Sequence, residues 1–132
     1  MGAGAMSALR AIVAVAVGGA VGSLARHGVN IAVGQLVGRP VPYATAAANL
    51  IGSAAIGALA GLIASGRLNM APAMRAFVFV GLLGGFTTFS SLMLDTLTLT
   101  HAGERSLAIA NLLGQALMGL AAVYAGYYLA AS

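Results

Sequence analysis

The chain has 132 residues, of which 61% are hydrophobic and only 6% are charged, and its mean hydropathy of +1.00 is typical of a membrane protein rather than a soluble domain. The net charge of +4 comes from arginines scattered singly along the chain, so a nucleic-acid partner is not expected. The lack of cysteine excludes disulfides, thiolate metal sites and thiol catalysis, and two widely separated histidines do not suggest a transition-metal site.

The first apolar stretch covers residues 11–25 and is bounded by an arginine at each end. Its length and small residues would also suit a cleaved signal peptide. Because the apolar character resumes over residues 29–37, we instead predict a membrane-spanning helix. The sequence GRPVP at residues 38–42 then ends this helix, since proline lacks a backbone donor and restricts the residue before it.

Three further uncharged stretches supply the roughly 20 apolar residues that cross a hydrocarbon core. They cover residues 44–64, 76–94 and 107–132, and short connections at residues 65–75 and 100–105 separate them. The prediction is an all-α membrane protein with four transmembrane helices, forming a single domain over the whole chain. Because the loops are short, any functional site must lie between the helices.

The arginines are balanced between the two sides of this predicted topology. Arg10, Arg67 and Arg75 fall on one side, Arg39 and Arg105 fall on the other, and Arg26 lies inside a helix near the second side. The positive-inside rule therefore gives no preferred orientation. Insertion in both orientations would permit an antiparallel dimer, although six arginines are also few enough to leave the orientation open.

Pairs of glycines four residues apart predict close packing between helices in lipid. These pairs are Gly18 with Gly22, Gly57 with Gly61, and Gly81 with Gly85. They indicate packing and not a mechanism.

Polar side chains follow the second and fourth predicted helices at a spacing of four residues. Thr45, Asn49 and Ser53 share one face of the second helix, drifting about 40° per step, and Asn111 and Gln115 share one face of the fourth. In lipid, such side chains face either a partner helix or a water-filled path, so they predict interhelical hydrogen bonds or the lining of a pore. Both stripes are uncharged, which does not suit a proton-coupled pump.

The stretch GGFTTFSSL, residues 84–92, is poorly suited to a continuous helix. Its glycines free the backbone, and its threonine hydroxyls compete for backbone hydrogen bonds. We therefore predict that the third helix is interrupted in this stretch, at mid-membrane, where freed carbonyls must find protein, water or a cation. A simple glycine kink at a helix crossing is the alternative.

Beyond the interruption, Phe89 stands beside Ser90 and Ser91. The edge of an aromatic ring carries partial positive charge, so a phenylalanine edge together with amide and hydroxyl donors could replace water around an anion without trapping it. A lone phenylalanine more often packs or faces lipid, so this hypothesis depends on its neighbours.

The same stretch resembles the GGxTTFSTF signature of the Fluc (CrcB) fluoride channels, which are small four-helix membrane proteins. Other landmarks resemble the family in the same order: a glycine-rich first helix from Gly18 to Arg26, the second-helix pattern Pro42, Thr45, Asn49 and Gly52, and a closing stretch from Gly119 to Gly126. The resemblance spans nearly the whole chain. It implies an antiparallel dual-topology dimer with two narrow pores in the lipid bilayer of a bacterial-type inner membrane, acting as a passive channel and not as an enzyme.

The resemblance also implies roles for individual residues. The backbone carbonyls of Gly84 and Thr87 would ligate a structural sodium ion at the dimer interface, and Arg26 and Asp95 would lie at the pore vestibule. The pore-lining residues would be Thr45, Asn49, Phe89, Ser90, Ser91, Leu92, Asn111 and Gln115.

The chain departs from the family pattern near the interruption and on the fourth helix, where Gly119 follows Asn111 and Gln115 at the same spacing of four. Leu92 occupies the second position of a paired "Phe box" and lacks the polar ring edge, and Asp95 stands where glutamate is usual. On the fourth helix, Asn111 and Gln115 stand where a tyrosine and a serine are common, so either Gln115 takes over the hydroxyl role or the pore is altered.

Fluoride export from the cytoplasm is the function that the resemblance implies, through a homodimer or through a heterodimer with a paired homologue. Two other classes of function suit a chain of this size. A small dual-topology multidrug exporter would share the arginine balance, but it would need an embedded glutamate that these spans lack. A non-conducting structural membrane protein would explain the glycines but not the ordered polar stripes.

Overall fold

The structure is a computed structural model that describes residues 2–39 and 41–132. Over these residues the elements are helices, and four helical spans are long and apolar enough to cross a membrane. They are α1 (Ala3–Val37), α2 (Tyr43–Ala64), a composite third span (Pro72–His101) and α6 (Arg105–Ala131). The predicted architecture of four apolar helices is confirmed.

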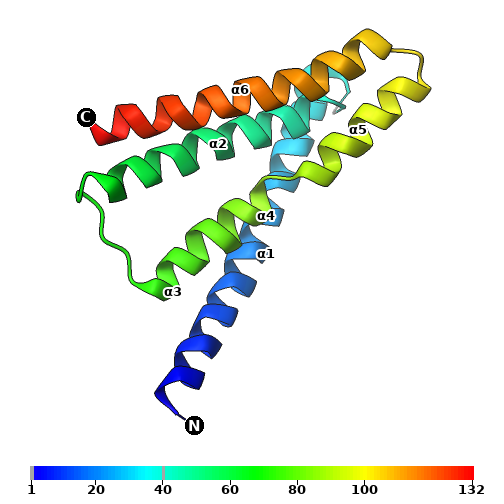
Figure 1. Cartoon of the computed structure of the whole chain (residues 1–132). Helices are drawn as coiled ribbons and strands as arrows, with labels where there is room; N and C mark the ends of the chain where they lie inside the picture. The colour runs from blue at the N-terminus through cyan, green and yellow to red at the C-terminus, as the bar shows by residue number, and fades with distance from the viewer. Residues whose placement is uncertain (1, 40) are drawn as a thin grey trace.

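The first span is a single helix of 35 residues. It ends at Gly38, whose φ of 78° is easy only for glycine and whose N–H donates to the carbonyl of Gly34 at 3.0 Å. The predicted end of the helix at residues 38–42 is confirmed, except that Pro40 lies outside the described residues. At about 1.5 Å per residue, α1 is about 52 Å long. Figure 1 shows its N-terminal end extending away from the other helices.

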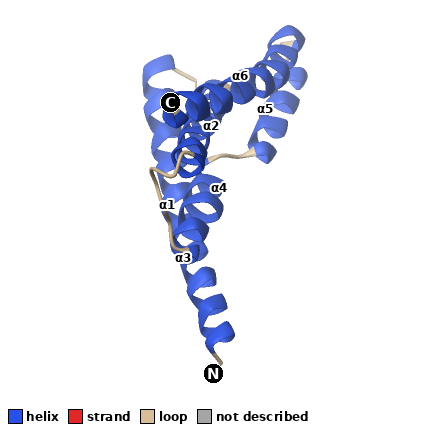
Figure 2. Cartoon of the chain, turned by 60° about the vertical axis from the view of Figure 1, so that its left-hand side comes forward, coloured by secondary structure: helices blue, strands red, loops and turns tan. Residues whose placement is uncertain are grey.

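The third span is a bent helix built from four joined elements. They are α3 (Pro72–Arg75), the π-helix η1 (Ala76–Leu83), α4 (Gly84–Phe86) and α5 (Phe89–His101). Between α4 and α5, Thr87 and Thr88 are extended, with ψ of 157° and 122°. The predicted interruption is therefore present, and Figure 2 shows it as a loop between α4 and α5. The helix nevertheless continues through Gly84, which has helical torsions, and ends at the threonines.

The spans pack as two parallel pairs along their glycines. In the first pair, a Cβ on Gly22 of α1 would collide with the carbonyl oxygen of Leu82, and a Cβ on Gly85 would lie 2.7 Å from the carbonyl oxygen of Gly19. In the second pair, a Cβ on Gly57 of α2 would collide with the backbone of α6 in the same way. Figure 1 shows α2 and α6 running side by side in the same direction. The predicted role of the spaced glycines in close packing is confirmed.

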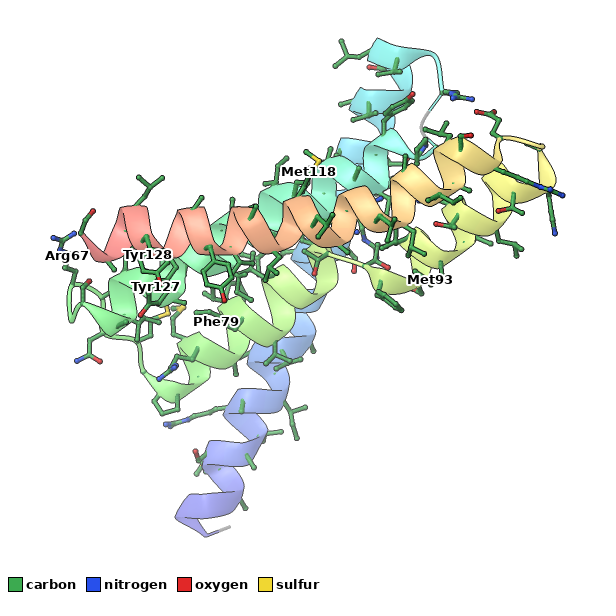
Figure 3. All side chains as sticks on the ribbon, turned by 45° about the horizontal axis from the view of Figure 1, so that its top comes forward. Arg67, Phe79, Met93, Met118, Tyr127 and Tyr128 are labelled. Carbon is green, nitrogen blue, oxygen red and sulfur yellow. The ribbon has the colours of Figure 1, made fainter. Side chains whose placement is uncertain are left out.

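Two arginines tie the connections together at opposite ends of the molecule. At one end, Arg39 forms an exposed ion pair with Glu104 (Nη1 to Oε1, 3.0 Å), and this hydrogen bond raises the pKa of Arg39 above its ordinary value. At the other end, Arg67 donates from Nη2 to the carbonyl oxygen of Ser132 at 2.7 Å. Figure 3 shows Arg67 beside Tyr127 and Tyr128 near the end of α6. The helices therefore alternate in direction, as the predicted topology requires.

Candidate functional site

The predicted site residues gather around the interruption, in two hollows that meet at Thr88. One is a groove of about 550 Å³ bordered by α2, η1, α5 and α6. The other is a polar cavity of about 350 Å³ between α1, α2 and α5. Thr88 lines both hollows, so the extended segment lies between them.

The groove contains most of the residues that were predicted to line a pore or to hold sodium. These are Asn49, Gly84, Thr87, Phe89, Leu92 and Gln115. Phe89 is 72% exposed, whereas Leu92, one helical turn later, is only 6% exposed. In the single chain, Leu92 is therefore buried against the neighbouring helices, whereas most of the Phe89 ring is accessible from outside the chain.

Asn49 braces the interruption through both ends of its side-chain amide. Its Oδ1 accepts from the backbone N–H of Thr88 at 2.8 Å, and its Nδ2 donates to the carbonyl of Thr88 at 3.1 Å. An uninterrupted helix would give these two backbone groups partners in neighbouring turns. The side chain of Asn49 supplies partners in their place, which is how a buried peptide group avoids the cost of an unmade hydrogen bond.

The amide contacts continue from α2 into α6. Asn49 Nδ2 donates to Gln115 Oε1 at 2.8 Å, and Gln115 Nε2 donates to Asn111 Oδ1 at 2.7 Å. Asn111 Nδ2 then donates to Thr96 Oγ1 on α5 at 2.9 Å. The interhelical hydrogen bonding predicted for the two polar stripes is confirmed at Asn49, Asn111 and Gln115. Asn111 borders neither hollow.

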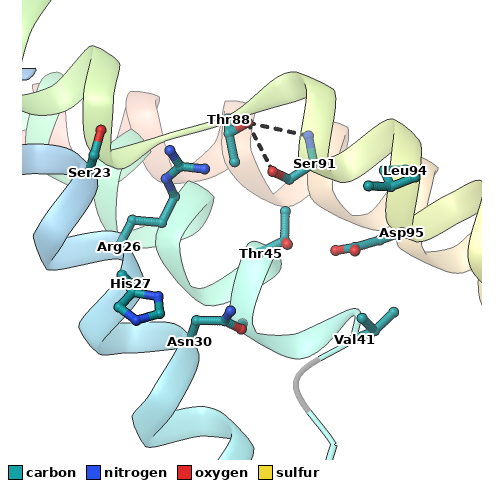
Figure 4. A pocket seen from close by; sticks show the side chains of 11 residues that line it. Ser23, Arg26, His27, Asn30, Val41, Thr45, Thr88, Ser91, Leu94 and Asp95 are labelled. Carbon is teal, nitrogen blue, oxygen red and sulfur yellow. Dashed lines mark hydrogen bonds between the residues drawn. The ribbon is translucent and has the colours of Figure 1, made fainter.

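Thr88 also caps α5, a role that the sequence analysis missed. Its Oγ1 accepts from the backbone N–H of Ser91 at 3.3 Å and contacts the hydroxyls of Ser90 and Ser91 at 3.2 Å each. Threonine is a favoured helix N-cap residue, and Thr88 directly precedes the helical segment that begins at Phe89. Its residue type and position could therefore have predicted this role. Ser90 is exposed and borders neither hollow, whereas Ser91 lines the polar cavity (Figure 4).

The carbonyls freed by the interruption fall into two groups. The carbonyl of Gly85 accepts from Arg26 Nε at 3.2 Å, and that of Thr88 accepts from Asn49. The carbonyls of Gly84, Phe86 and Thr87 receive no hydrogen bond within residues 2–39 and 41–132. Unpaired carbonyl oxygens are the ligands that a hard cation such as sodium requires, so the carbonyls of Gly84 and Thr87 fit the predicted ligand set.

The polar cavity brings together the two residues predicted for a vestibule. Figure 4 shows Arg26, Thr45 and Asp95 around it. Asp95 is only 9% exposed, and its Oδ2 has no hydrogen-bond partner among the described residues. Among the described residues Arg26 forms no ion pair with this carboxylate, and its Nε donates instead to the carbonyl of Gly85.

Three residues of α1 that the sequence analysis did not assign also line this cavity: Ser23, His27 and Asn30. They stand at positions i, i+4 and i+7, which is the spacing of one helix face. That spacing was visible in the sequence and would have identified a polar face on the first helix.

The chain matches the family model described as CrcB-like protein, Camphor Resistance (CrcB), over residues 13–127. It is 48% identical over 113 residues to the fluoride-specific ion channel FluC of Paracoccus denitrificans, an alignment covering 85% of this chain and 87% of that protein. It is 44% identical over 115 residues to FluC of Nitrobacter winogradskyi, covering 87% and 90% of the two chains. A FluC of Roseiflexus sp. is 41% identical over 115 residues, covering 87% and 92%. Because the family model covers α1 from residue 13, the whole interrupted third span and α6 as far as residue 127, and the relatives are at least 41% identical over most of the chain, the chain belongs to the CrcB family.

Proposed function

We propose that the chain is a fluoride-selective channel through which the anion leaves the cytoplasm passively. The observation that carries this proposal is the uncharged groove at the interruption, where the amides of Asn49 and Gln115 stand among mainly apolar residues, in a chain whose relatives are named fluoride-specific ion channels. Fluoride holds its water strongly, so a pore must offer closely placed hydrogen donors in exchange. Neutral donors suit conduction because they bind the anion without holding it.

The groove is open in a single chain, and we propose that a second copy in antiparallel orientation covers it. Phe89 supports this proposal, since a ring that is 72% exposed at the mouth of a donor-lined groove would otherwise face acyl chains. Two copies related in this way would enclose two equivalent paths. Each path would place the ring edge of Phe89 and the amide of Gln115 beside the anion.

The polar cavity would serve as the vestibule of this path. Arg26 would attract the anion, and Thr45 and Ser91 would offer hydroxyl donors beside it. The carboxylate of Asp95 keeps the cavity from holding an excess positive charge, which would retain the anion. The route between the cavity and the groove would pass Thr88, which lines both.

A sodium ion fits the unpaired carbonyls of Gly84 and Thr87, which would hold it where the two interruptions meet in the dimer. Its charge would satisfy carbonyl oxygens that have no donor among the described residues. The chain itself orients the Thr87 carbonyl, because the Thr88 N–H of the same peptide group donates to Asn49 Oδ1 at 2.8 Å.

The test is anion efflux from liposomes that contain the purified chain alone. We expect fluoride to leave rapidly and chloride to remain, with protein-free liposomes as the control. Equal rates for the two anions would contradict selectivity. Proton-coupled uptake of a quaternary amine would instead point to a multidrug exporter.

A further inference from the structure

We infer that Gln115 supplies the amide N–H that contacts the permeating anion, and that Asn49 is a positioning residue whose donors are already in use. This inference rests on the proposed function and names the donor within it. It follows from the direction and number of the hydrogen bonds that join the two polar stripes.

The orientation of the first two amides is set by the backbone. The N–H of Thr88 can only donate, so the atom of Asn49 that it meets at 2.8 Å must be the oxygen. The nitrogen of Asn49 therefore faces Gln115 at 2.8 Å, and the atom it meets there must be the oxygen of Gln115. This places Nε2 of Gln115 on the far side of its amide.

The other end of the chain of hydrogen bonds agrees with this direction. Nε2 of Gln115 donates to Asn111 Oδ1, so Nδ2 of Asn111 faces Thr96 and donates to its hydroxyl oxygen. The proton of that hydroxyl is directed to the carbonyl of Leu92 at 2.8 Å, which can only accept. A backbone donor at one end and a backbone acceptor at the other thus fix every amide between them, independently of how each oxygen and nitrogen is assigned.

Counting the donors then separates the three amides. Asn49 has two amide hydrogens, and both are used, by the carbonyl of Thr88 and by Gln115. Gln115 uses one of its two, for Asn111, and within the described residues its second hydrogen has no acceptor. Asn111 also has a second hydrogen, but it does not border the groove, whereas Gln115 does. Gln115 is therefore the amide with a free donor at the groove.

The position of Gln115 within the chain of hydrogen bonds also strengthens its remaining donor. Its Oε1 accepts from Asn49, and a hydrogen bond received at an amide oxygen polarises the N–H groups of the same amide. The residue stays neutral, so it binds an anion without adding fixed charge. Burial keeps water from competing, since Gln115 is only 8% exposed.

The first test replaces the amide with a side chain of similar length and no donor. In liposomes, we expect Gln115→Met to lower fluoride efflux about 10- to 100-fold, the range expected for losing one hydrogen bond to an ion. The fluoride-to-chloride ratio should fall with it. Leu113→Met is the matched control, because Leu113 lies on α6, is exposed and borders neither hollow. It should conduct like the unaltered chain.

The second test observes the donors directly and needs no variant. In nuclear magnetic resonance spectra of the unaltered protein, fluoride titration should shift the side-chain amide protons of Gln115 more than those of Asn49, which reach the anion only through their hydrogen bond to Gln115. The opposite pattern would overturn the assignment, as would a conducting Gln115→Met with unchanged selectivity. Failure of the unaltered chain to pass fluoride would instead contradict the proposed function. A Gln115→Met chain that does not fold leaves the spectra to decide.

Discussion

Two residues one turn apart at the start of α5 face different surroundings, although the family resemblance treats them as a pair. Phe89 stands open at the mouth of the groove, and Leu92 is packed within it. The ring of Phe89 can therefore present its polar edge to an ion, whereas Leu92 can contribute only shape.

We expect Phe89→Ile to block fluoride efflux, because an aliphatic side chain of similar bulk has no positive edge to offset dehydration. Leu92→Phe should leave efflux intact or raise it by adding a second ring edge. Both variants can be compared in the same liposome assay. Unchanged conduction in Phe89→Ile would remove the aromatic ring from the mechanism.

Asn49 offers a test of stability rather than of conduction. Asn49→Leu removes the hydrogen-bond partners of both the N–H and the C=O of Thr88. We therefore expect a loss of about 2 kcal/mol or more in unfolding free energy, measured by thermal denaturation in detergent. Ser53→Ala is the control, since it lies on the same stripe and its hydroxyl makes no hydrogen bond among the described residues. It should change stability by less than about 0.5 kcal/mol. Equal losses in the two variants would contradict the bracing role.

The polar stripes themselves could be predicted from their spacing, but the partners of their amides could not. That Asn49 would bond to Thr88, 39 residues away, depends on how α2 meets the third span. The polar face of α1 was visible in the spacing of its residues, but that it lines a cavity could not be predicted, because this depends on where α5 lies.

Among the helices, the glycine pairs were the most informative local pattern. Their spacing correctly predicted close backbone approach, and the structure adds which pairs meet: those of α1 with those of η1 and α4, and those of α2 with the backbone of α6. At each of these glycines the neighbouring backbone leaves no room for a Cβ atom, so a substitution at any one of them should disturb the packing.

Gly22→Ala should destabilise the protein by about 1–3 kcal/mol, because its Cβ would collide with a backbone carbonyl that cannot move aside. The matched control is Gly28→Ala on the same helix, where a Cβ meets nothing within 4 Å. Alanine there should be neutral or should stabilise the helix by up to about 1 kcal/mol. Thermal unfolding of both variants would test the contrast, and similar midpoints would contradict it.

The third span shows where sequence reasoning reaches its limit. The stretch GGFTT predicted an interruption, yet the glycines are helical and the threonines carry the break. Glycine permits both conformations, so its torsions are decided by packing against α1. The π-helix η1 was not predicted, because its apolar sequence AFVFVGLL differs in no visible way from that of an ordinary helix.

The overall arrangement of four alternating spans followed directly from the lengths of the apolar stretches and from the turn residues between them. The arrangement of copies is a different matter, because it concerns surfaces that a single chain leaves open. The balanced arginines and the uncovered groove support an antiparallel pair. Such a pair requires the chain to insert in both orientations, which can be measured.

We expect C-terminal fusions to a reporter active only in the cytoplasm and to one active only outside it to be active to similar degrees. Replacing Arg39 with alanine should shift the balance, since it leaves the side that carries Arg67 and Arg75 with more positive charge. Arg67→Ala should shift it in the opposite direction. Strong activity of only one reporter in the unaltered chain would contradict dual topology.

The unequal lengths of the helices determine how each one matches the thickness of the surrounding bilayer. The 22 residues of α2 extend over about 33 Å, close to the thickness of an acyl core, whereas α1 has about 20 Å to spare. In a thicker membrane, α1 can stand more upright, but α2 is already fully stretched across. A thicker bilayer must therefore thin locally beside α2 and not beside α1. The cost of this hydrophobic mismatch would fall on the α2 side of the protein and not on the α1 side.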